Sequence, residues 1–268
     1  MDGKMHACAL TSLHETDPFT LSAYVLSLQH IKAPDAKGRL TVLLDAISTG
    51  CKLVAMLVRK ADVKDVMGLA GSSNVHGEDQ KQLDIVANEA FKNLLRRSGQ
   101  CAVLVTEEED EPIFIDEAHR GQYCVVFDPL DGSSNIECGV SIGTIFGIYR
   151  VNDGSSGSLA DPGSEMVAAG YCMYGSMTYM MLSVGAGVAG FTLDPNLGEF
   201  VLTHPSLSIP PQGKIYSIND ANMSQWDEAT RKYVEECNSG KPVAFSHRYV
   251  GSMVADVHRT LLYGGIFM

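Results

Sequence analysis

The chain has 268 residues, of which 45% are hydrophobic and 19% charged, as in an ordinary soluble globular protein. A formal net charge of −12 argues against general binding to nucleic acid or to an anionic membrane surface. The seven cysteines include no Cys-x-x-Cys pair, which excludes a usual zinc or disulfide framework and favours a cytoplasmic protein. Met1 to Thr20 lacks a long apolar stretch, so no secretory signal is predicted.

Helices are predicted in the first part of the chain. Apolar residues recur with helical spacing from Leu21 to Ile31, from about Leu40 to Arg59, and from Leu83 to Leu95. Between the second and third helix, Gly68 to Gly77 is rich in glycine, serine and asparagine and is predicted to be a loop.

Short strands are predicted to dominate the middle of the chain. Residues 166–193 carry no charge, but glycines and turn signals divide the stretch, which favours buried strands over a membrane span. Gly185 to Gly190 fits the pattern G-x-G-x-x-G, yet a strand and not a helix is predicted to follow, so no dinucleotide site is expected. The predicted strands are 102–105, 113–115, 123–127, 142–151 and several within 166–202.

Prolines at positions 205, 210 and 211 predict a boundary between domains at 1–205 and 206–268. The second domain is predicted to contain a strand at 214–218 and helices near 225–237 and 253–262. Helices first, then a sheet, then mixed structure indicate a layered α+β protein.

Two predicted strands end in acidic residues. The first is followed by Glu107 and Glu108, and the second by Asp128 and Asp131. Each run alone is more typical of a solvated loop or a turn. If the strands are neighbours, the carboxylates converge, and two of them about 4 Å apart repel by roughly 4 kcal/mol at an effective dielectric near 20. Such a cluster needs cations, and oxygen-only ligands suit Mg²⁺ or Mn²⁺.

An anion site is predicted directly after the second acidic run. Gly132-Ser133-Ser134 offers backbone N–H groups and hydroxyls in series, and Ser134-x-x-Glu137 fits a helix capping box. Metal ions beside an anion site are the parts needed to transfer a phosphoryl group to water.

The sequence resembles the fructose-1,6-bisphosphatases, within the lithium-sensitive, magnesium-dependent phosphatase superfamily. The match extends from about Thr20 to the last residue. A Glu-Glu pair followed by D-P-x-D-G-[ST] is the superfamily signature. The narrower matches are Phe127-Asp128-Pro129-Leu130-Asp131-Gly132-Ser133-Ser134-Asn135-Ile136, residues 143–150, Ala70-Gly71-Ser72-Ser73-Asn74-Val75, and Arg248-Tyr249-Val250-Gly251-Ser252-Met253-Val254-Ala255-Asp256.

The resemblance implies a fold and a reaction. The fold would be the layered α-β-α-β sandwich of the sugar phosphatases, and the reaction would be hydrolysis of the 1-phosphate of fructose 1,6-bisphosphate. The implied cofactor is Mg²⁺, with Mn²⁺ or Zn²⁺ as substitutes. Glu78, Asp84 and Glu108 would be catalytic, the first two within a loop and a helix start. The implied metal ligands are Glu107, Glu108, Asp128, the Leu130 carbonyl and Asp131.

The resemblance also implies the substrate contacts and an assembly. Asp131, Gly132, Ser133 and Ser134 would hold the 1-phosphate. In this family the arginine that matches Arg248 reaches a neighbouring subunit's site. The chain would therefore form a homo-oligomer, as a tetramer. The 6-phosphate and sugar contacts would come from Asn219, Arg248, Tyr249, Gly251, Ser252 and Met253.

The sequence departs from the family in two places. Family chains continue past the stretch matching Gly264-Gly265-Ile266-Phe267, so this chain, ending at Met268, is expected to have a defective active site. In AMP-inhibited members a threonine-glycine-glutamate element and a lysine-tyrosine pair bind the nucleotide. Here they read Lys37-Gly38-Arg39 and Gln122-Tyr123, which leaves AMP inhibition open.

Two alternatives to fructose-1,6-bisphosphatase remain at this stage. One is another phosphatase of the superfamily, acting on sedoheptulose bisphosphate or on an inositol phosphate. The other is a catalytically weak subunit that serves as an oligomer partner.

Overall fold

The computed structural model describes residues 18–66, 76–151, 163–185, 187–241 and 244–268, without the side chains of 61–66 and 76–82. The chain divides into two compact units, Met1–Ser206 and Leu207–Met268, and each is described by itself.

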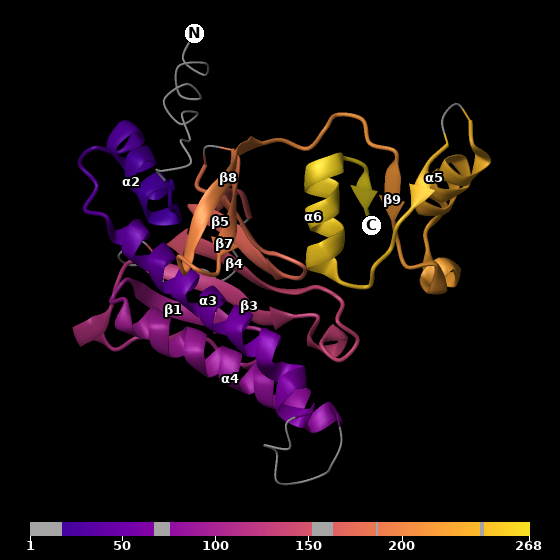
Figure 1. Ribbon diagram of the computed structural model, residues 1–268. Helices are drawn as coiled ribbons and strands as arrows, with labels where there is room; N and C mark the ends of the chain where they lie inside the picture. Colours follow the sequence, from indigo (N-terminus) through magenta and orange to yellow (C-terminus); the bar gives the residue numbers. More distant parts are fainter. Residues whose placement is uncertain (1–17, 67–75, 152–162, 186, 242–243) are drawn as a thin grey trace. The chain divides into compact units, whose positions relative to one another are not determined.

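The described part of the first unit opens with helices, and the two labelled α3 and α4 run side by side in Figure 1. Helix α2 spans Leu21–Lys32 and begins where the Thr20 hydroxyl accepts the N–H of Ala23 at 3.3 Å. Helix α3 spans Arg39–Val66 and helix α4 spans His76–Arg97, so both are longer than predicted. Glycine in a helix costs only about 1 kcal/mol relative to alanine. Gly77, predicted to be the last residue of a loop, can for this reason be accommodated inside α4.

An eight-stranded sheet with the order β2-β1-β3-β4-β5-β6-β7-β8 follows the helices. Strand β1 pairs with β3 in parallel, whereas its pairing with β2 and the successive pairs from β3 to β7 are antiparallel. The strands are β1 (Cys101–Thr106), β2 (Ile113–Phe114), β3 (Tyr123–Asp131), β4 (Ile142–Arg150), β5 (Ala168–Tyr174), β6 (Thr178–Ser183), β7 (Val188–Asp194) and β8 (Glu199–Leu207). Short 3₁₀ helices lie at η1 (Glu117–His119), η2 (Ser133–Asn135) and η3 (Gly163–Glu165).

The main core lies between the helices and the sheet. Phe91 of α4 is 1% exposed and its ring lies 5.8 Å from that of Phe127 on β3. Ile47 of α3 and Val125 of β3 belong to the same buried cluster. Burying one such side chain contributes about 1.5–3 kcal/mol, so this contact fixes α4 against the strand that carries Asp128.

Two sequence predictions concern hydrophobic segments. The uncharged stretch 166–193 forms β5, β6 and β7, which confirms the prediction of strands. Gly187 precedes strand β7, so the helix that a dinucleotide fingerprint requires does not follow. Residues Arg39–Lys60 of α3 are long and apolar enough to cross a membrane, with a mean hydropathy of 1.7, but half of this window is buried inside the protein. Such burial is typical of a core helix.

The second unit contains a three-stranded parallel sheet. Strand β9 (Ile215–Ser217) lies between β10 (Ser246–His247) and β11 (Ile266–Phe267). Its helices are η4 (Asp220–Gln225), α5 (Glu228–Ser239) and α6 (Met253–Tyr263). Helix α5 begins three residues later than predicted, because the Asp227 carboxylate caps it by accepting the N–H of Thr230 at 2.7 Å. With both units described, the predicted layered α+β class is confirmed.

Candidate active site

The acidic ends of strands β1 and β3 lie side by side. The parallel register pairs Thr106 with Phe127, and the N–H of Glu107 donates to the Phe127 carbonyl at 3.2 Å. Glu107 directly follows the last residue of β1, and Asp128 directly follows Phe127 within β3. Because parallel neighbours present their ends at the same edge of a sheet, these two carboxylates share one edge.

Asp128 is the strongly perturbed acid of this edge. Burial, followed by a hydrogen bond to Glu107 and the charges of Glu107 and Asp131, raises the pKa of Asp128 to about 7. Its Oδ1 atom also accepts the N–H of Leu130 at 2.9 Å, which favours the ionised form and holds the side chain in place. The carboxylates therefore repel one another, as the sequence predicted for neighbouring strands.

Helix α4 adds a further carboxylate to this edge. Asp84 lies inside α4 and not at a helix start, and its side chain hydrogen-bonds to Ser133. Burial, with a smaller effect from Glu107, raises the pKa of Asp84, and its Oδ1 atom is buried with no hydrogen-bond partner among the described residues. The pKa of Glu108 is also raised, by partial burial and by the charges of Asp84 and Glu107. Glu78 is within α4 instead of the predicted loop, and its side chain is outside the described part of the chain.

The donor set fits a hard divalent cation in its chemistry. All of the side chains gathered here offer oxygen, and a buried carboxylate oxygen without a donor, as on Asp84, is a usual feature of a cation ligand. Within the residues that the structure describes, however, no three His, Cys, Asp or Glu side chains lie close enough together to form a ready-made metal-binding group.

The turn after Asp128 is held from the neighbouring strands. The hydroxyl of Thr144, fully buried on β4, donates to the Pro129 carbonyl at 2.8 Å. Since that proton is used, the hydroxyl of Tyr174, 2.6 Å away, donates to Thr144. A register shift in the β3–β4 pairing between Asp128 and Asp131 marks a bulge, which re-aims the side chains at this point.

The predicted anion-binding segment forms a tight turn. Gly132 has φ 76°, a left-handed conformation that favours glycine, and it precedes the 3₁₀ helix Ser133–Asn135. The capping-box spacing at Ser134 does not begin an α-helix, because the chain makes a single 3₁₀ turn there. The side chain of Leu130 is 3% exposed and packs in the core, so this residue can offer only its carbonyl to a ligand.

Sequence reasoning missed three residues that support the acidic edge: Asn88, Lys92 and Glu109. Lys92 is 8% exposed and forms ion pairs with Glu109 and with Glu89. The hydrogen bond from Lys92 lowers the pKa of Glu109. The signal was present in the helix: Asp84, Asn88 and Lys92 are spaced four residues apart and so share one helix face.

The predicted sugar-phosphate residues lie in the second unit. Arg248 and Tyr249 are exposed in the loop between β10 and α6. The side chain of Asn219 caps η4 by accepting the N–H of Ala221 at 3.1 Å. Ser252 is the N-cap residue of α6, and its buried hydroxyl has no hydrogen-bond partner among the described residues. Gly251 has φ 82° and Met253 is exposed at the first position of α6.

Asp256 holds the loop that carries Arg248 and Tyr249. Its carboxylate is fully buried and accepts the N–H of Val250 at 3.0 Å. The guanidinium of Arg259 forms an ion pair with Asp256 and also donates to the Arg248 carbonyl. A carboxylate that the sequence pattern left without a role therefore sets the backbone of the exposed loop.

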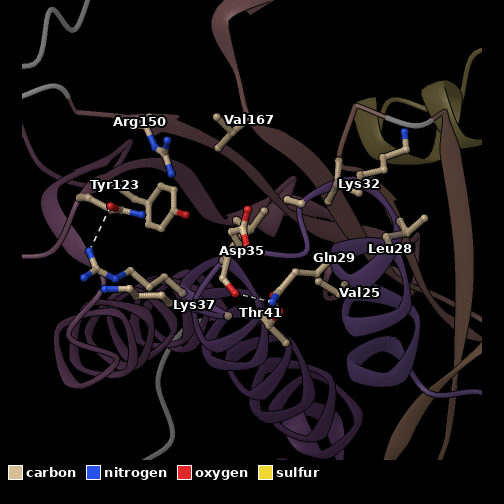
Figure 2. A pocket seen from close by; sticks show the side chains of 17 residues that line it. Val25, Leu28, Gln29, Lys32, Asp35, Lys37, Thr41, Tyr123, Arg150 and Val167 are labelled. Carbon is tan, nitrogen blue, oxygen red and sulfur yellow. Dashed lines mark hydrogen bonds between the residues drawn. The ribbon is translucent and has the colours of Figure 1, made fainter.

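A separate cavity of about 600 Å³ lies at the opposite end of strand β3 (Figure 2). Tyr123, at the start of β3, lines this cavity, roughly 20 Å from the acidic end at about 3.3 Å per residue. Its lining includes the basic residues Lys32, Lys37, Arg39 and Arg150, against the single acid Asp35. The Arg39 guanidinium donates to the Gln122 side chain at 3.1 Å. The cavity thus favours an anionic ligand, and this binding site is separate from the acidic edge.

Two protein-family models together match nearly all of the described chain. A family model for the fructose-1,6-bisphosphatase N-terminal domain matches residues 19–205, and one for the C-terminal domain matches 209–268. The cytosolic fructose-1,6-bisphosphatases of Oryza sativa subsp. indica and Arabidopsis thaliana are each 57% identical to this chain, over 95% of its length and 76% of theirs. That of Solanum tuberosum is 55% identical with the same coverage.

Solved structures agree with the sequence comparison. The Leishmania major fructose-1,6-bisphosphatase in holo form superposes with a TM-score of 0.81 at 42% identity, over 94% of this chain and 76% of that one. The T-state structure of the same protein gives a TM-score of 0.84 at 41% identity, over 94% and 77%. With both domain models, sequence identity above half and a shared fold, the chain belongs to the fructose-1,6-bisphosphatase family.

Proposed function

We propose that the chain hydrolyses the 1-phosphate of D-fructose 1,6-bisphosphate to give fructose 6-phosphate and inorganic phosphate in the cytosol. The observation that carries this proposal is the pairing of Glu107 with Asp128 at the common edge of β1 and β3, next to the turn at Gly132. The cytosolic fructose-1,6-bisphosphatases at 55–57% identity support both the reaction and the location.

The family implies a divalent cation, and we assign it as Mg²⁺, with Mn²⁺ or Zn²⁺ as substitutes. When bound, the cation would neutralise phosphate oxygens and lower the pKa of the attacking water. The residues proposed to hold it are Glu107, Glu108, Asp128, the Leu130 carbonyl and Asp131.

The chain's own groups bind the phosphate and move the proton. Asp131, with the N–H groups and hydroxyls of Gly132, Ser133 and Ser134, holds the 1-phosphate in line with the attacking water. The water oxygen bonds to phosphorus as the bond from phosphorus to the C1 oxygen breaks. One proton of the water passes to the relay formed by Glu78, Asp84 and Glu108, and the protonated carboxyl group of this relay returns it to the C1 oxygen as that oxygen leaves. The raised pKa of Asp84 makes its carboxylate a stronger base than an exposed aspartate, which suits this task.

The second unit is proposed to recognise the remainder of the substrate. Arg248 offers a planar donor fork and Tyr249 a hydroxyl to the 6-phosphate, with Asn219 as a further contact. Gly251, Ser252 and Met253 contact the sugar. We propose that 1–205 is the domain with the metal site and 206–268 the substrate domain, in a homo-oligomer, as a tetramer.

The alternatives are less well supported. The quoted relatives and structures are named fructose-1,6-bisphosphatase, and none is named for sedoheptulose bisphosphate or for an inositol phosphate. The same relatives, all named as enzymes, favour an active phosphatase over a catalytically weak subunit.

The test is phosphate release from fructose 1,6-bisphosphate, sedoheptulose bisphosphate and inositol phosphate, each with and without Mg²⁺. Wild type is compared with Asp131→Asn and with Asp116→Asn, whose carboxylate is exposed away from the cluster. Fructose 1,6-bisphosphate is expected to be the preferred substrate, and Asp131→Asn alone to be inactive. Activity that survives both removal of Mg²⁺ and Asp131→Asn would contradict the proposal.

The cavity beside Tyr123 supports a second ligand. We propose an anionic effector there, with AMP as the compound to test first, because the basic residues of the lining outnumber its single acid. A titration of phosphatase activity with AMP tests this assignment, and unaltered activity at saturating AMP would exclude that nucleotide.

A further inference from the structure

Three consecutive glutamates follow strand β1, and their environments differ. The side chain of Glu109 points to helix α4, where it forms an ion pair with Lys92 and accepts the Asn88 side-chain N–H at 3.3 Å. Glu107 instead interacts with Asp128 and Asp84, and Glu108 interacts with Asp84. The structure therefore separates one glutamate of the run from the other two.

Helix α4 holds this turn on both sides of the Glu107–Glu108 pair. Before the pair, the buried Thr106 hydroxyl donates to the side-chain oxygen Oδ1 of Asn88 at 2.9 Å and accepts the Glu108 N–H at 3.4 Å. After the pair, Glu109 is held by Lys92, which is itself fixed by Glu89 at 2.7 Å. Asn88 joins the two contacts because its amide meets both Thr106 and Glu109. Asn88 and Lys92 are 6% and 8% exposed, so both side chains are enclosed by the fold.

We propose that Lys92, together with Asn88, is a positioning residue that keeps Glu109 out of the carboxylate cluster. Of the three glutamates, Glu107 is then left beside Asp128 and Glu108 beside Asp84. This inference rests on the proposed function, since it takes Glu107 and Glu108 to be metal ligands.

The charges give the physical reason. The backbone bond from Glu107 to Phe127 already brings the carboxylates of Glu107 and Asp128 to one edge, and a further carboxylate there would add to their repulsion. If Lys92 lost its charge, the partly buried Glu109 would lose its cation. The turn would then rearrange toward solvent or toward the cluster, and either change moves Glu108, which is the adjacent residue.

The experiment measures Mn²⁺ binding to the purified chain, from the electron paramagnetic resonance signal of free Mn²⁺. Lys92→Met keeps the length of the side chain and removes its charge, and it is expected to weaken binding about tenfold. Lys92→Arg, which keeps the charge, is expected to bind within about threefold of wild type. Lys92→Met combined with Glu109→Gln is expected to regain most of the affinity, because the glutamate that needed the cation is gone.

Three results would count against the inference or the function on which it rests, besides the one given below for Asn88→Ser. The first is a folded Lys92→Met that has a lower melting temperature and wild-type Mn²⁺ affinity, as expected for a structural role alone. The second is a double variant as weak as Lys92→Met. If Lys92→Met does not fold, Asn88→Ser replaces it: weaker Mn²⁺ binding supports the inference and unchanged binding overturns it. The third is a Glu107→Gln variant that binds Mn²⁺ as tightly as the wild type does. That result would contradict the proposed metal ligands, and with them the proposed function.

Discussion

The backbone N–H of Glu107 donates to the carbonyl of Phe127 at 3.2 Å, and this bond locks two acidic strand ends side by side. Phe127 is 6% exposed and stacks near Phe91 of α4, so the hydrophobic core fixes its position. The core thereby holds Glu107 and Asp128 close together, although their negative charges repel each other. Stability and catalysis are expected to conflict at this edge.

Glu107→Gln tests that conflict. Removing one charge from the cluster is expected to relieve about 1 kcal/mol of repulsion, which raises the melting temperature of the metal-free protein by about 2–4 °C for a chain of this size. The same change is expected to abolish Mg²⁺-dependent phosphate release. Thermal unfolding with a chelator and with Mg²⁺ measures the first effect, and Glu117→Gln, at an exposed site, is the control. A lower melting temperature without metal would contradict the prediction.

Thr144→Val tests the support of the Asp128–Asp131 turn. The variant has the same shape but leaves the buried Pro129 carbonyl and the Tyr174 hydroxyl without their partner. The expected loss is about 1–3 kcal/mol of unfolding free energy, measured by urea denaturation. A fall in kcat is expected beyond what the unfolded fraction explains. Thr192→Val, whose hydroxyl meets the exposed Thr203, is the matched control and should lose less than about 0.5 kcal/mol. Equal losses in both variants would argue against a special role for Thr144.

Asp256→Asn tests the support of the Arg248–Tyr249 loop. The amide keeps one acceptor for the Val250 N–H but removes the charge that pairs with Arg259. Breaking a buried ion pair is strongly destabilising, and the loop is expected to lose its fixed conformation. The KM for fructose 1,6-bisphosphate should rise about tenfold with a smaller change in kcat, which indicates lost substrate binding. Asp220→Asn, at an exposed pair with His247, serves as the control. An unchanged KM would show that Asp256 does not position the loop.

The sequence predicted the parts of this protein that depend on local pattern. Alternating and helical hydrophobicity located the helices and most strands, and the acidic runs marked the edge where Glu107 meets Asp128. The start of α4 was missed, because Gly77 and the polar residues before it have the composition of a loop. The role of Glu109 could not be predicted, since three adjacent glutamates are equivalent until the fold brings Lys92, on the preceding helix, into contact with one of them. Asp256 was missed for the same reason: its partners, Val250 and Arg259, are defined only by the folded loop.

Gln122→Lys tests the anionic cavity at the start of β3. In the wild type, the Arg39 guanidinium donates to the Gln122 oxygen at 3.1 Å, so this basic group is already engaged within the lining. A lysine at 122 removes that acceptor from Arg39 and adds a fifth basic group to the lining. Each charge-assisted hydrogen bond to a phosphate contributes about 1.5–3 kcal/mol. The AMP concentration for half-inhibition of phosphatase activity is therefore expected to fall at least about tenfold, or about 1.4 kcal/mol. Gln122→Met, similar in size and uncharged, also releases Arg39 and separates this effect from the added charge. If the lysine and methionine variants respond to AMP alike, the added cation does not reach the ligand, and the cavity binds its anion through Arg39 and the other basic residues alone.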